Sequence, residues 1–599
     1  MDETTGQYTL VLTAEDAKQC IKAITDNGDI HALDFETTGL RPEGARVRLT
    51  CISGPAGNFV IDHFRVGPFK RYALSLAKAC SWAVFNAGFE GRWFDFATGG
   101  PDVVLYDVGV MSKAKLGGGP LSLALQVKRD LKKTRDNKHL QTSDWSQYTL
   151  TQEQYDYGFE DAEDTFALYK MWDEELTEAH WNGFLVLNDA WRGTAEMEDT
   201  GMLIDTGYHA GLITMWGLRR SAAEITIRRY TPESLIANIR SKKQLSDFLK
   251  TTLDKNSLEA WPKTAKAEQL QTDRKQLRQA SFRAPYPMSR WLASLMVYNR
   301  ADKYLSTYGD NLLTKQELSS DGRVHGRFNI AQAVTGRYSS SQPNLQNIPR
   351  SQTVRRSFIS PVGTDMVLAD YSGVELRVLA EVSNDAQLKQ DVIFGDVHAE
   401  SAMTLFPVER KEFMERLKNK DPRAKEMRSK AKAFSFQLTY GAGNAALAVV
   451  LRCTDAEAGK YVERWAERYP EAYALRYKMF DQMNDRGFLP IKSGRTVFVH
   501  RNDRTLPVAS NYPIQGAAAD VMYRAVTRMS KVVYDLPFDA RMMASIHDEL
   551  LMLSEAGRGE ELREIMVEEM RQAWLDIFPN SATDNLSESA VGTSWAAKP

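Results

Sequence analysis

The chain has 599 residues, enough for about four domains of ordinary size. Apolar residues make up 43% and charged residues 26%, an ordinary composition that excludes a collagen-like, mucin-like or largely disordered chain. Because 76 Lys and Arg oppose 78 Asp and Glu, the formal net charge is −2 and no overall basic excess indicates a nucleic-acid partner.

Several protein classes lack their signals in this sequence. The four cysteines form no CxxC pair, which argues against a zinc site or a disulfide framework and favours a reducing compartment. The acidic N-terminus resembles neither a signal peptide nor a transit peptide, and no run of about 18 apolar residues occurs. No GxxxxGK[ST] string is present, which argues against a P-loop NTPase. We therefore expect a cytoplasmic protein that does not span a membrane.

The pattern of residues 1–182 predicts an α/β domain. The run 29–36 is typical of a strand that ends in a polar turn, and 82–85 is a second short apolar strand. Residues 150–170 predict a helix with Thr151 as its N-cap. Strands that alternate with helices indicate an α/β architecture.

Acidic residues at the first strand suggest a metal site. Asp34 and Glu36 alternate along the strand, so their side chains leave the same face about 7 Å apart. Such a pair alone is weak evidence, because acids at strand ends often only terminate pairing. Asp161 on the predicted helix, with Tyr157 one turn before it, strengthens the hypothesis. Three carboxylates and a phenol would suit two-metal hydrolysis of a phosphodiester.

Residues 183–320 are mostly helical in pattern and suggest a long arm. The segment 251–285 interrupts the helical periodicity around 261–264, and we expect a loop or turn there. The arm carries basic residues that would give it a cationic face, namely Arg219, Arg220, Arg228, Arg229, Arg240, Lys242 and Lys243.

Two further aspartates each follow an apolar run in the second half of the chain. Asp370 follows 366–369, and Asp548 follows 543–547. If the two runs are neighbouring strands, they present two carboxylates to a pair of Mg²⁺ ions, which prefer oxygen ligands. Taken alone, His547 and its acidic neighbours would indicate only a β-turn.

A basic run with a regular pattern lies between these aspartates. Residues 410–432 contain ten Lys or Arg against four acids, which alone could be a solvated helix face. However, Arg428, Lys432, Phe436 and Tyr440 recur every four residues, so they share one face of a helix. Two cations followed by two rings could hold a triphosphate at one end and stack a base at the other.

Three strings near the N-terminus resemble a known family. DFETTGL at 34–40, NAGFE at 86–90 and YGFED at 157–161 are similar to the exonuclease motifs of the DEDDy 3′ to 5′ proofreading domain. The resemblance implies metal ligands at Asp34, Glu36 and Asp161. It also implies a water-orienting role for Tyr157 and a DNA contact at Asn86.

The middle motif departs from the family, because Glu90 stands where the family has Asp. We expect Glu90 to be a working metal ligand, since one extra methylene adds only about 1.5 Å of reach. The alternative is that Glu90 merely solvates a helix start and proofreading is weakened. Asp95 could substitute, although a five-residue offset turns it away from the face of Glu90.

The second half resembles DNA polymerase family A. DYSGVELR at 370–377, RSKAKAFSFQLTYG at 428–441 and SIHDEL at 545–550 are similar to motifs A, B and C. The strings at 197–205, 322–349, 511–520 and 591–595 add to the likeness, and all lie in the family's order. The matches extend over nearly all of the chain.

This resemblance implies a fold and a domain order. We expect an α/β exonuclease domain, RNase H-like with a mixed sheet, followed by a mainly helical right-hand polymerase domain with an antiparallel palm sheet. The implied boundaries are 1–182 for the exonuclease domain and 183–599 for the polymerase domain, with the thumb at about 200–320, the palm at about 321–400 and 485–599, and the fingers at about 401–484.

The resemblance also implies residue roles. It places two Mg²⁺ ions in each active site, with Mn²⁺ as a substitute, and in the polymerase site their ligands are Asp370 and Asp548. Arg428 and Lys432 complete the catalytic set as triphosphate contacts. Glu375 would exclude a 2′-hydroxyl. The remaining nucleotide contacts are His398, Phe436, Tyr440 and Tyr371, and the primer-template contacts are Arg337, Asn511, Gln515 and His547.

The implied function is template-directed DNA synthesis from a primer 3′-hydroxyl, with proofreading, in replication or repair. The expected partners are primer-template DNA and dNTPs, and beyond them a replisome helicase or other replication proteins; the chain itself is expected to be a monomer. Gly373 in place of Gln resembles some phage replicative polymerases, while Pro507 stands where an Arg would contact DNA. We also expect no 5′-nuclease domain and no large processivity insertion in the thumb.

Three alternatives compete with this interpretation. A single-subunit RNA polymerase has related motifs, but Glu375 and the exonuclease motifs argue against it. A non-catalytic DNA-binding protein is disfavoured because Asp370, Asp548, Arg428 and Lys432 are all retained. A nuclease with a polymerase-like scaffold would show no extension that depends on dNTPs.

Overall fold

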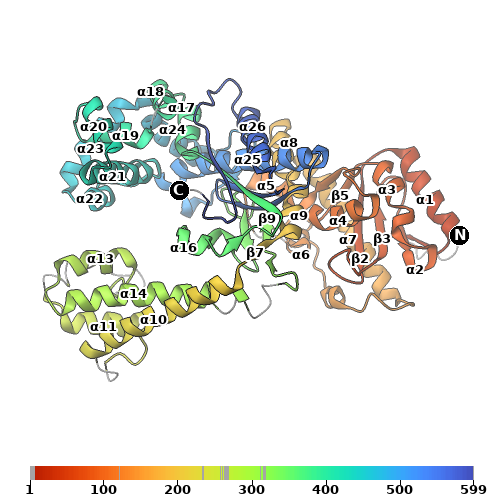
Figure 1. Cartoon of the computed structure of the whole chain (residues 1–599). Helices are drawn as coiled ribbons and strands as arrows, with labels where there is room; N and C mark the ends of the chain where they lie inside the picture. The colour runs from red at the N-terminus through yellow and green to blue at the C-terminus, as the bar shows by residue number, and fades with distance from the viewer. Residues whose placement is uncertain are drawn as a thin grey trace.

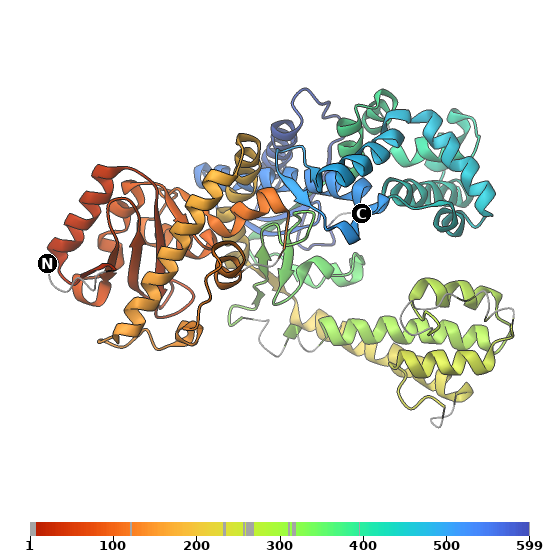
Figure 2. The same cartoon turned by 180° about the vertical axis from the view of Figure 1, so that it is seen from behind.

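The structure is a computed structural model that describes residues 7–597 apart from 120–121, 232–234, 256–257, 259–260, 262–268, 310–311, 314–318 and 395. The predicted turn at 262–264 lies outside the described residues. An α/β unit occupies the N-terminal end of the molecule, a central sheet lies next to it, and two groups of helices extend from the centre on the opposite side (Figures 1 and 2).

The N-terminal unit is built on a six-stranded sheet. Its order is β1-β4-β3-β2-β5-β6, with parallel pairing at β1–β4, β2–β5 and β5–β6 and antiparallel pairing at β4–β3 and β3–β2. The predicted mixed sheet is therefore confirmed. The strands are β1 (Thr9–Val11), β2 (His31–Thr37), β3 (Val47–Ser53), β4 (Phe59–Asp62), β5 (Trp82–Val84) and β6 (Leu105–Asp107).

Helices cover this sheet, and in the chain they lie between its strands and after the last of them. They are α1 (Ala14–Asn27), α2 (His63–Val66), α3 (Ala73–Ala79), α4 (Ala87–Thr98), α5 (Val108–Leu116), α6 (Leu123–Gln126) and α7 (Gln152–Glu175). Shorter turns of helix are η1 (Phe69–Arg71), η2 (Val127–Leu131) and η3 (Lys138–Thr142).

Helix α7 forms where the sequence predicted it and lies close to the sheet. Thr151 is its N-cap: the Thr151 hydroxyl accepts from the Gln154 amide, and the Gln154 side chain accepts from the Thr151 amide over 3.0 Å. Gly158 allows the close approach, since a Cβ there would lie 3.0 Å from Cys51 Sγ and 3.2 Å from Glu36 Cγ. This contact brings the acids of α7 next to those of β2.

The central sheet is antiparallel throughout, which confirms the palm-sheet prediction. Its order is β15-β16-β12-β17, from β15 (Ala540–Ile546), β16 (Glu549–Glu555), β12 (Thr364–Tyr371) and β17 (Ser587–Gly592). The apolar run 366–369 is fully buried in β12. Two long helices, α25 (Leu506–Asp535) and α26 (Gly559–Ile577), pack against this sheet and each other.

One group of helices forms a long arm. Helices α10 (Thr206–Tyr230) and α14 (Met288–Tyr308) lie side by side, and α11 (Lys242–Thr252) and α13 (Arg274–Arg283) pack at their far end around a core of their own (Figure 1). The loop expected over 251–285 is therefore wrong for 274–283. Leu277, which is 1% exposed, packs into that core, and this burial favours the helix.

The second group consists of the helices between β12 and β13. They are α17 (Val374–Ser383), α18 (Ala386–Phe394), α19 (Val397–Leu405), α20 (Arg410–Lys418), α21 (Pro422–Thr439), α22 (Asn444–Leu451), α23 (Asp455–Arg468) and α24 (Pro470–Arg486). Helix α21 contains Arg428, Lys432 and Phe436 of the four-residue pattern, and Tyr440 is its C-cap residue.

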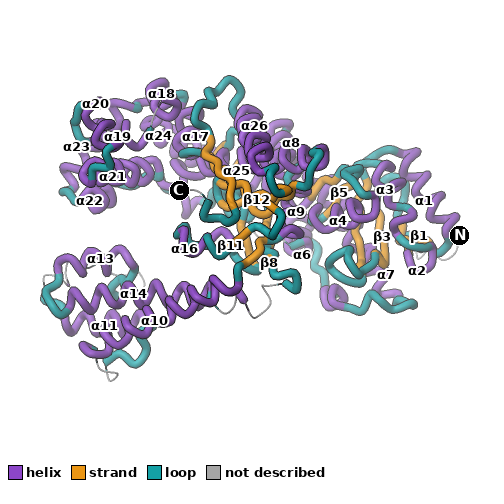
Figure 3. The backbone as a smooth tube through the Cα atoms, viewed as in Figure 1, coloured by secondary structure: helices purple, strands orange, loops and turns teal. Residues whose placement is uncertain are grey.

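Short elements join these parts. They are α8 (Glu178–Asn188), α9 (Trp191–Thr200), β7 (Met202–Ile204), β8 (Arg323–Val324), β9 (Arg327–Asn329), β10 (Ser339–Ser341), η4 (Leu345–Asn347), α16 (Gln352–Arg355), β11 (Phe358–Ile359), β13 (Phe488–Pro490), β14 (Thr496–Phe498) and η5 (Arg501–Asp503). The strands thus gather in the N-terminal unit and at the centre, and helices make up the rest (Figure 3). None of the described helices combines the length and apolar character needed to cross a bilayer.

Candidate active sites

The central sheet brings Asp370 and Asp548 together. Asp370 is opposite Glu549 in the β12–β16 ladder, and the Tyr371 amide donates to the Asp548 carbonyl over 3.1 Å. Both aspartates line a cavity of about 860 Å³ whose other walls include residues of α19 and α21. Two carboxylates therefore stand at one side of a cavity large enough for a nucleotide.

The turn between β15 and β16 is held in place from outside the sheet. His547 adopts φ 60°, in the left-handed region. The Gln346 side chain accepts from the His547 amide over 2.8 Å and donates to the Ser545 carbonyl over 2.7 Å. Burial, followed by the nearby Arg350 guanidinium, lowers the pKa of the His547 imidazole. Sequence reasoning gave Gln346 no role, although it lies inside the string at 322–349.

One face of α21 forms the opposite wall. Arg428, Lys432, Phe436 and Tyr440 all line the cavity, and the Lys432 ammonium lies 5.9 Å from the centre of the Phe436 ring. His398 of α19 lies across from them, with its ring 5.7 Å from that of Phe436. Burial and then these two cations lower the pKa of His398 to about 4, so the imidazole is neutral at pH 7 and can contact a phosphate as a hydrogen-bond donor.

Asp396, one of the acids that line the cavity, already has a cationic partner. Asp396 forms an ion pair with Arg428 and also caps α19, accepting from the amides of His398 and Ala399. The sequence gave no sign of this pairing.

Glu375 is held from two sides. It forms an ion pair with Arg337 and accepts a hydrogen bond from the Tyr440 hydroxyl. Arg337, predicted to contact the primer-template, thus lies at this cavity, where its charge holds Glu375. Gly373 adopts φ 61° at the start of α17, and a Cβ there would meet no atom within 4 Å, so its left-handed backbone is what favours glycine.

Tyr371 stays a predicted nucleotide contact, while two predicted DNA contacts lie outside the residues that line the cavity. Tyr371 is among the lining residues, but its side chain is 1% exposed and its hydroxyl donates to the Met570 carbonyl over 2.7 Å, so the hydroxyl points away from the cavity. Asn511 and Gln515 lie one turn apart on α25 and do not line the cavity. The Gln515 side chain is near the Tyr440 hydroxyl.

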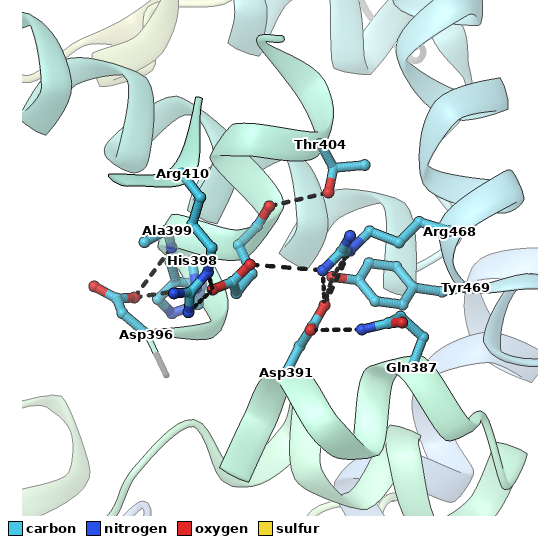
Figure 4. Close-up of polar contacts among 10 residues, drawn as sticks. Gln387, Asp391, Asp396, His398, Ala399, Thr404, Arg410, Arg468 and Tyr469 are labelled. Carbon is cyan, nitrogen blue, oxygen red and sulfur yellow. Dashed lines mark hydrogen bonds and ion pairs between the residues drawn. The ribbon is translucent and has the colours of Figure 1, made fainter. Parts of the chain in front are cut away.

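A second polar network joins the helices behind α19 (Figure 4). Asp391 of α18 accepts from Arg468 and from the Tyr469 hydroxyl, each over 2.7 Å, and from Gln387 over 2.9 Å. Arg468 also lies 3.6 Å from Glu400 of α19. These contacts tie α18, α19 and α23 together, so the helix that carries His398 is held by its neighbours.

The N-terminal unit contains the second acidic site. Side-chain oxygens of Asp34, Glu36 and Asp161 lie within 4.8 Å of one another. Burial, followed by mutual repulsion, raises the pKa of Asp34 and Glu36 well above the ordinary range, and burial also raises the pKa of Asp161. Carboxylates at this spacing stay ionised together only when cations lie close to them, and their oxygen donors suit a hard divalent ion.

Glu90 lies near these acids, although it is not one of the three whose oxygens are within 4.8 Å of one another. It lies in the first turn of α4, is 2% exposed, and its Oε2 has no hydrogen-bond partner among the described residues. Burial, followed by the charge of Asp34, raises its pKa. Asp95 is instead bound by Arg192 at 3.0 and 3.2 Å, so it is not a substitute ligand. The unpartnered buried oxygen fits a metal ligand better than a solvated helix start.

Tyr157 borders this acidic site, and Asn86 directly precedes the helix that carries Glu90. Tyr157 is buried one turn before Asp161, and burial, followed by the Asp161 charge, raises the pKa of its phenol, which therefore stays protonated. Asn86 adopts φ 90° directly before α4, and its amide donates to Asp107 over 3.3 Å. Sequence reasoning missed Arg135, which forms an ion pair with Asp161.

Comparisons with known proteins agree with this arrangement. The family model for DNA polymerase family A matches residues 217–596, and a 3′-5′ exonuclease model matches residues 8–177. DNA polymerase I of Pseudomonas aeruginosa is 30% identical over 424 residues, which cover 67% of this chain and 42% of that one. The thermostable DNA polymerase I of Thermus aquaticus is 30% identical over 414 residues, covering 67% and 46%. The chain thus spans less than half the length of these relatives.

A solved structure aligns over almost the whole chain. It is the POL domain of Pol1 from M. smegmatis in complex with DNA primer-template and dNTP. The TM-score is 0.80 and the identity 25%, and the alignment covers 98% of this chain and 99% of that one.

Proposed function

The chain belongs to DNA polymerase family A and carries a 3′-5′ exonuclease domain, and on this premise we propose that it is a DNA-directed DNA polymerase that proofreads its product. The observation that carries the proposal is the pair Asp370 and Asp548, set across one cavity from Arg428 and Lys432. The solved relative binds primer-template DNA and a dNTP, and we propose the same substrates here.

In this proposal the palm carboxylates bind divalent metal. Asp370 and Asp548 offer hard oxygen donors beside the cavity, which suits Mg²⁺. Bound ions of this kind lower the pKa of an attacking hydroxyl and stabilise the charge that develops on the transferred phosphate. The primer 3′-oxygen would bond to the α-phosphorus of the dNTP while the bond to pyrophosphate breaks.

The α21 face would hold the triphosphate. Lys432 supplies a point charge and His398 a neutral donor, while Arg428 would exchange Asp396 for phosphate oxygens when a dNTP enters. Phe436 and Tyr440 would offer ring faces to the sugar and the base. In this arrangement the residues along one helix face would contact first the triphosphate, through Arg428 and Lys432, and then the sugar and base, through Phe436 and Tyr440.

Glu375 is expected to exclude ribonucleotides. Arg337 and the Tyr440 hydroxyl fix its carboxylate, so it cannot swing aside for a 2′-hydroxyl. We expect Glu375→Ala to raise rNTP incorporation relative to dNTP by about tenfold or more, which corresponds to about 1.4 kcal/mol of lost discrimination. The measurement is the ratio of incorporation efficiencies for dCTP and CTP opposite one template base.

A matched control for the exclusion of ribonucleotides by Glu375 lies on the same helix. Glu381 of α17 forms an ion pair with Lys389 and is not among the residues of the cavity. Glu381→Ala should leave the ratio unchanged. An unchanged ratio in Glu375→Ala would mean that Glu375 does not exclude ribonucleotides.

The acidic site of the N-terminal unit is proposed to hydrolyse the primer end. Asp34, Glu36, Glu90 and Asp161 would hold two divalent ions, which would lower the pKa of water and stabilise negative charge on the leaving oxygen. The protonated Tyr157 phenol is suited to orient the attacking water by a hydrogen bond.

Glu90 is expected to be a working ligand, although the family has Asp there. Replacing it by Gln removes the charge with little change of size. Excision of a mismatched primer end should fall by about 10–100-fold, the range found when residues around a metal are altered. Asp95→Asn is the control, because Arg192 already neutralises Asp95. Full activity in Glu90→Gln, or no excision by the unchanged chain, would contradict the assignment.

Several finer statements belong to the same proposal. They are the division into thumb, palm and fingers, the use of Mg²⁺ in place of other divalent ions, a monomeric state, a cytoplasmic location, a phage-like origin, and a helicase or other replication protein as partner. The helical arm α10–α14 would serve as the thumb and α20–α24 as the fingers.

Single-nucleotide addition tests the proposal against its alternatives. With one dNTP supplied at a time, a labelled primer should gain one nucleotide only when that dNTP pairs with the next template base. An RNA polymerase would prefer the rNTP, and a scaffold or binding protein would add nothing. Addition that ignores the template base would contradict the proposal.

A further inference from the structure

A buried guanidinium lies among the carboxylates of the N-terminal site. The Arg135 side chain is 6% exposed and forms an ion pair with Asp161. Its other nitrogens lie 3.4 Å from Asp164 and 3.6 Å from Glu160, and its guanidinium carbon is 5.8 Å from the centre of the Tyr157 ring. Arg135 comes from the connection between η2 and η3, not from the sheet or α7.

The pairing with Asp161 cannot coexist with a metal ion on the same oxygen. Asp161 Oδ1 is the atom in contact with Arg135, and Asp161 is also part of the group of three acids that could hold an ion. A divalent ion would lie about 2.1 Å from such an oxygen. An ion bound to this oxygen would also lie next to the guanidinium of Arg135. The two positive charges would repel each other strongly in a buried site.

The charges of the loaded site nevertheless call for one more cation. The acids near Arg135 carry six negative charges when ionised, while two divalent ions and Lys133 would supply five positive ones; the acids are Asp34, Glu36, Glu90, Asp161, Glu160 and Asp164. The phosphodiester of a bound DNA end adds one further negative charge. Arg135 supplies one positive charge next to that position, already buried and beside Tyr157.

We propose that Arg135 is a phosphate-positioning residue of the exonuclease, which pairs with Asp161 in the unloaded site and moves to the terminal phosphodiester when metal ions take Asp161. The inference rests on the proposed exonuclease function. Arg135 therefore opposes metal binding in the absence of DNA and favours binding of the DNA end once metal is bound.

This double role gives Arg135→Gln two opposite effects, which a purely structural role would not produce. The first readout is Mn²⁺ affinity without DNA, followed by the electron paramagnetic resonance of free Mn²⁺. All proteins carry Asp370→Asn and Asp548→Asn to remove the polymerase ligands, and Asp34→Asn with Asp161→Asn identifies the Mn²⁺ bound by the exonuclease acids. We expect Arg135→Gln to bind Mn²⁺ about tenfold more tightly, because one buried positive charge is gone.

The second readout is the KM and kcat for excision of a single-stranded oligonucleotide at saturating Mn²⁺. We expect Arg135→Gln to raise KM about tenfold or more while kcat changes less, since a charge-assisted contact to the phosphate is lost. Arg135→Lys should restore part of both effects, because it keeps the charge but not the two-nitrogen fork.

Lys133 provides the matched control. It lies on the same connection and contacts Glu160 at 2.9 Å and Asp164 at 2.8 Å. Lys133→Gln should leave both readouts within about twofold of the unchanged chain, as expected for a half-exposed ion pair.

The outcomes separate this inference from the proposed function. Tighter Mn²⁺ binding together with a raised KM in Arg135→Gln supports it. Unchanged or weaker Mn²⁺ binding, or an unchanged KM, overturns it while leaving the exonuclease assignment intact. No Mn²⁺ bound by the exonuclease acids in any protein overturns both.

Discussion

Replacing Asp370 or Asp548 by asparagine is expected to reduce primer extension by about 100–1,000-fold, the cost of removing one group that stabilises transition-state charge. Asparagine keeps the size of the side chain and its neutral hydrogen bonds. The change therefore removes the negative charge that the two strand ends present at the cavity. The measurement is single-turnover extension of a labelled primer in Mg²⁺.

Two controls show that such a loss is specific. Primer-template affinity should stay within about threefold, because DNA binding comes mainly from phosphate contacts by cations spread over other elements. Excision should persist, since the acids of the N-terminal site lie on β2, α4 and α7, apart from the central sheet. Extension within about tenfold of the unchanged chain would contradict the assignment of either aspartate.

Replacing Asp34 and Glu36 together by asparagine and glutamine should give the reverse pattern. Excision should fall by about 1,000-fold, because two of the four buried carboxylates lose the charge that holds the metal ions. Extension should be unchanged. The measurement is the shortening of a labelled single-stranded oligonucleotide, run beside extension of a matched primer.

The same double variant also tests independence of the two sites. Its polymerase cavity contains neither residue. Loss of extension with excision would mean that the two units fail together, and retained excision would mean that the N-terminal acids are not the metal ligands.

Much of the fold follows from local patterns. The continuous apolar run 366–369 predicts a strand buried on both faces, and β12 has that place between β16 and β17. The N-cap Thr151 and the four-residue spacing from Arg428 to Tyr440 predict helices that the structure contains. In each case the signal lies within one helix or strand, where the spacing of residues along the sequence determines their positions in space.

Tyr371 shows what strand alternation adds to a motif. Consecutive residues of a strand point to opposite faces of the sheet. Because Asp370 faces the cavity, the Tyr371 side chain faces the helix behind the sheet, where its hydroxyl reaches the Met570 carbonyl. Alternation along β12 therefore predicts that this side chain turns away from the cavity that Tyr371 lines.

Other site residues leave no local signal. Arg135 lies in an irregular connection and meets Asp161 only because the chain folds back. Gln346 and His547 are 201 positions apart, and Asp396 and Arg428 are 32 apart. Such pairs depend on tertiary packing, and neither periodicity nor composition reports them.

Primer extension with and without dNTPs tests the central claim most directly, that one chain both copies a template and removes the primer end. A 5′-labelled primer on a longer template is incubated in Mg²⁺ with the unchanged chain, and its length is followed. With all four dNTPs we predict lengthening to the end of the template; without them we predict stepwise shortening from the 3′ end. A primer that does not lengthen when dNTPs are present would contradict the account.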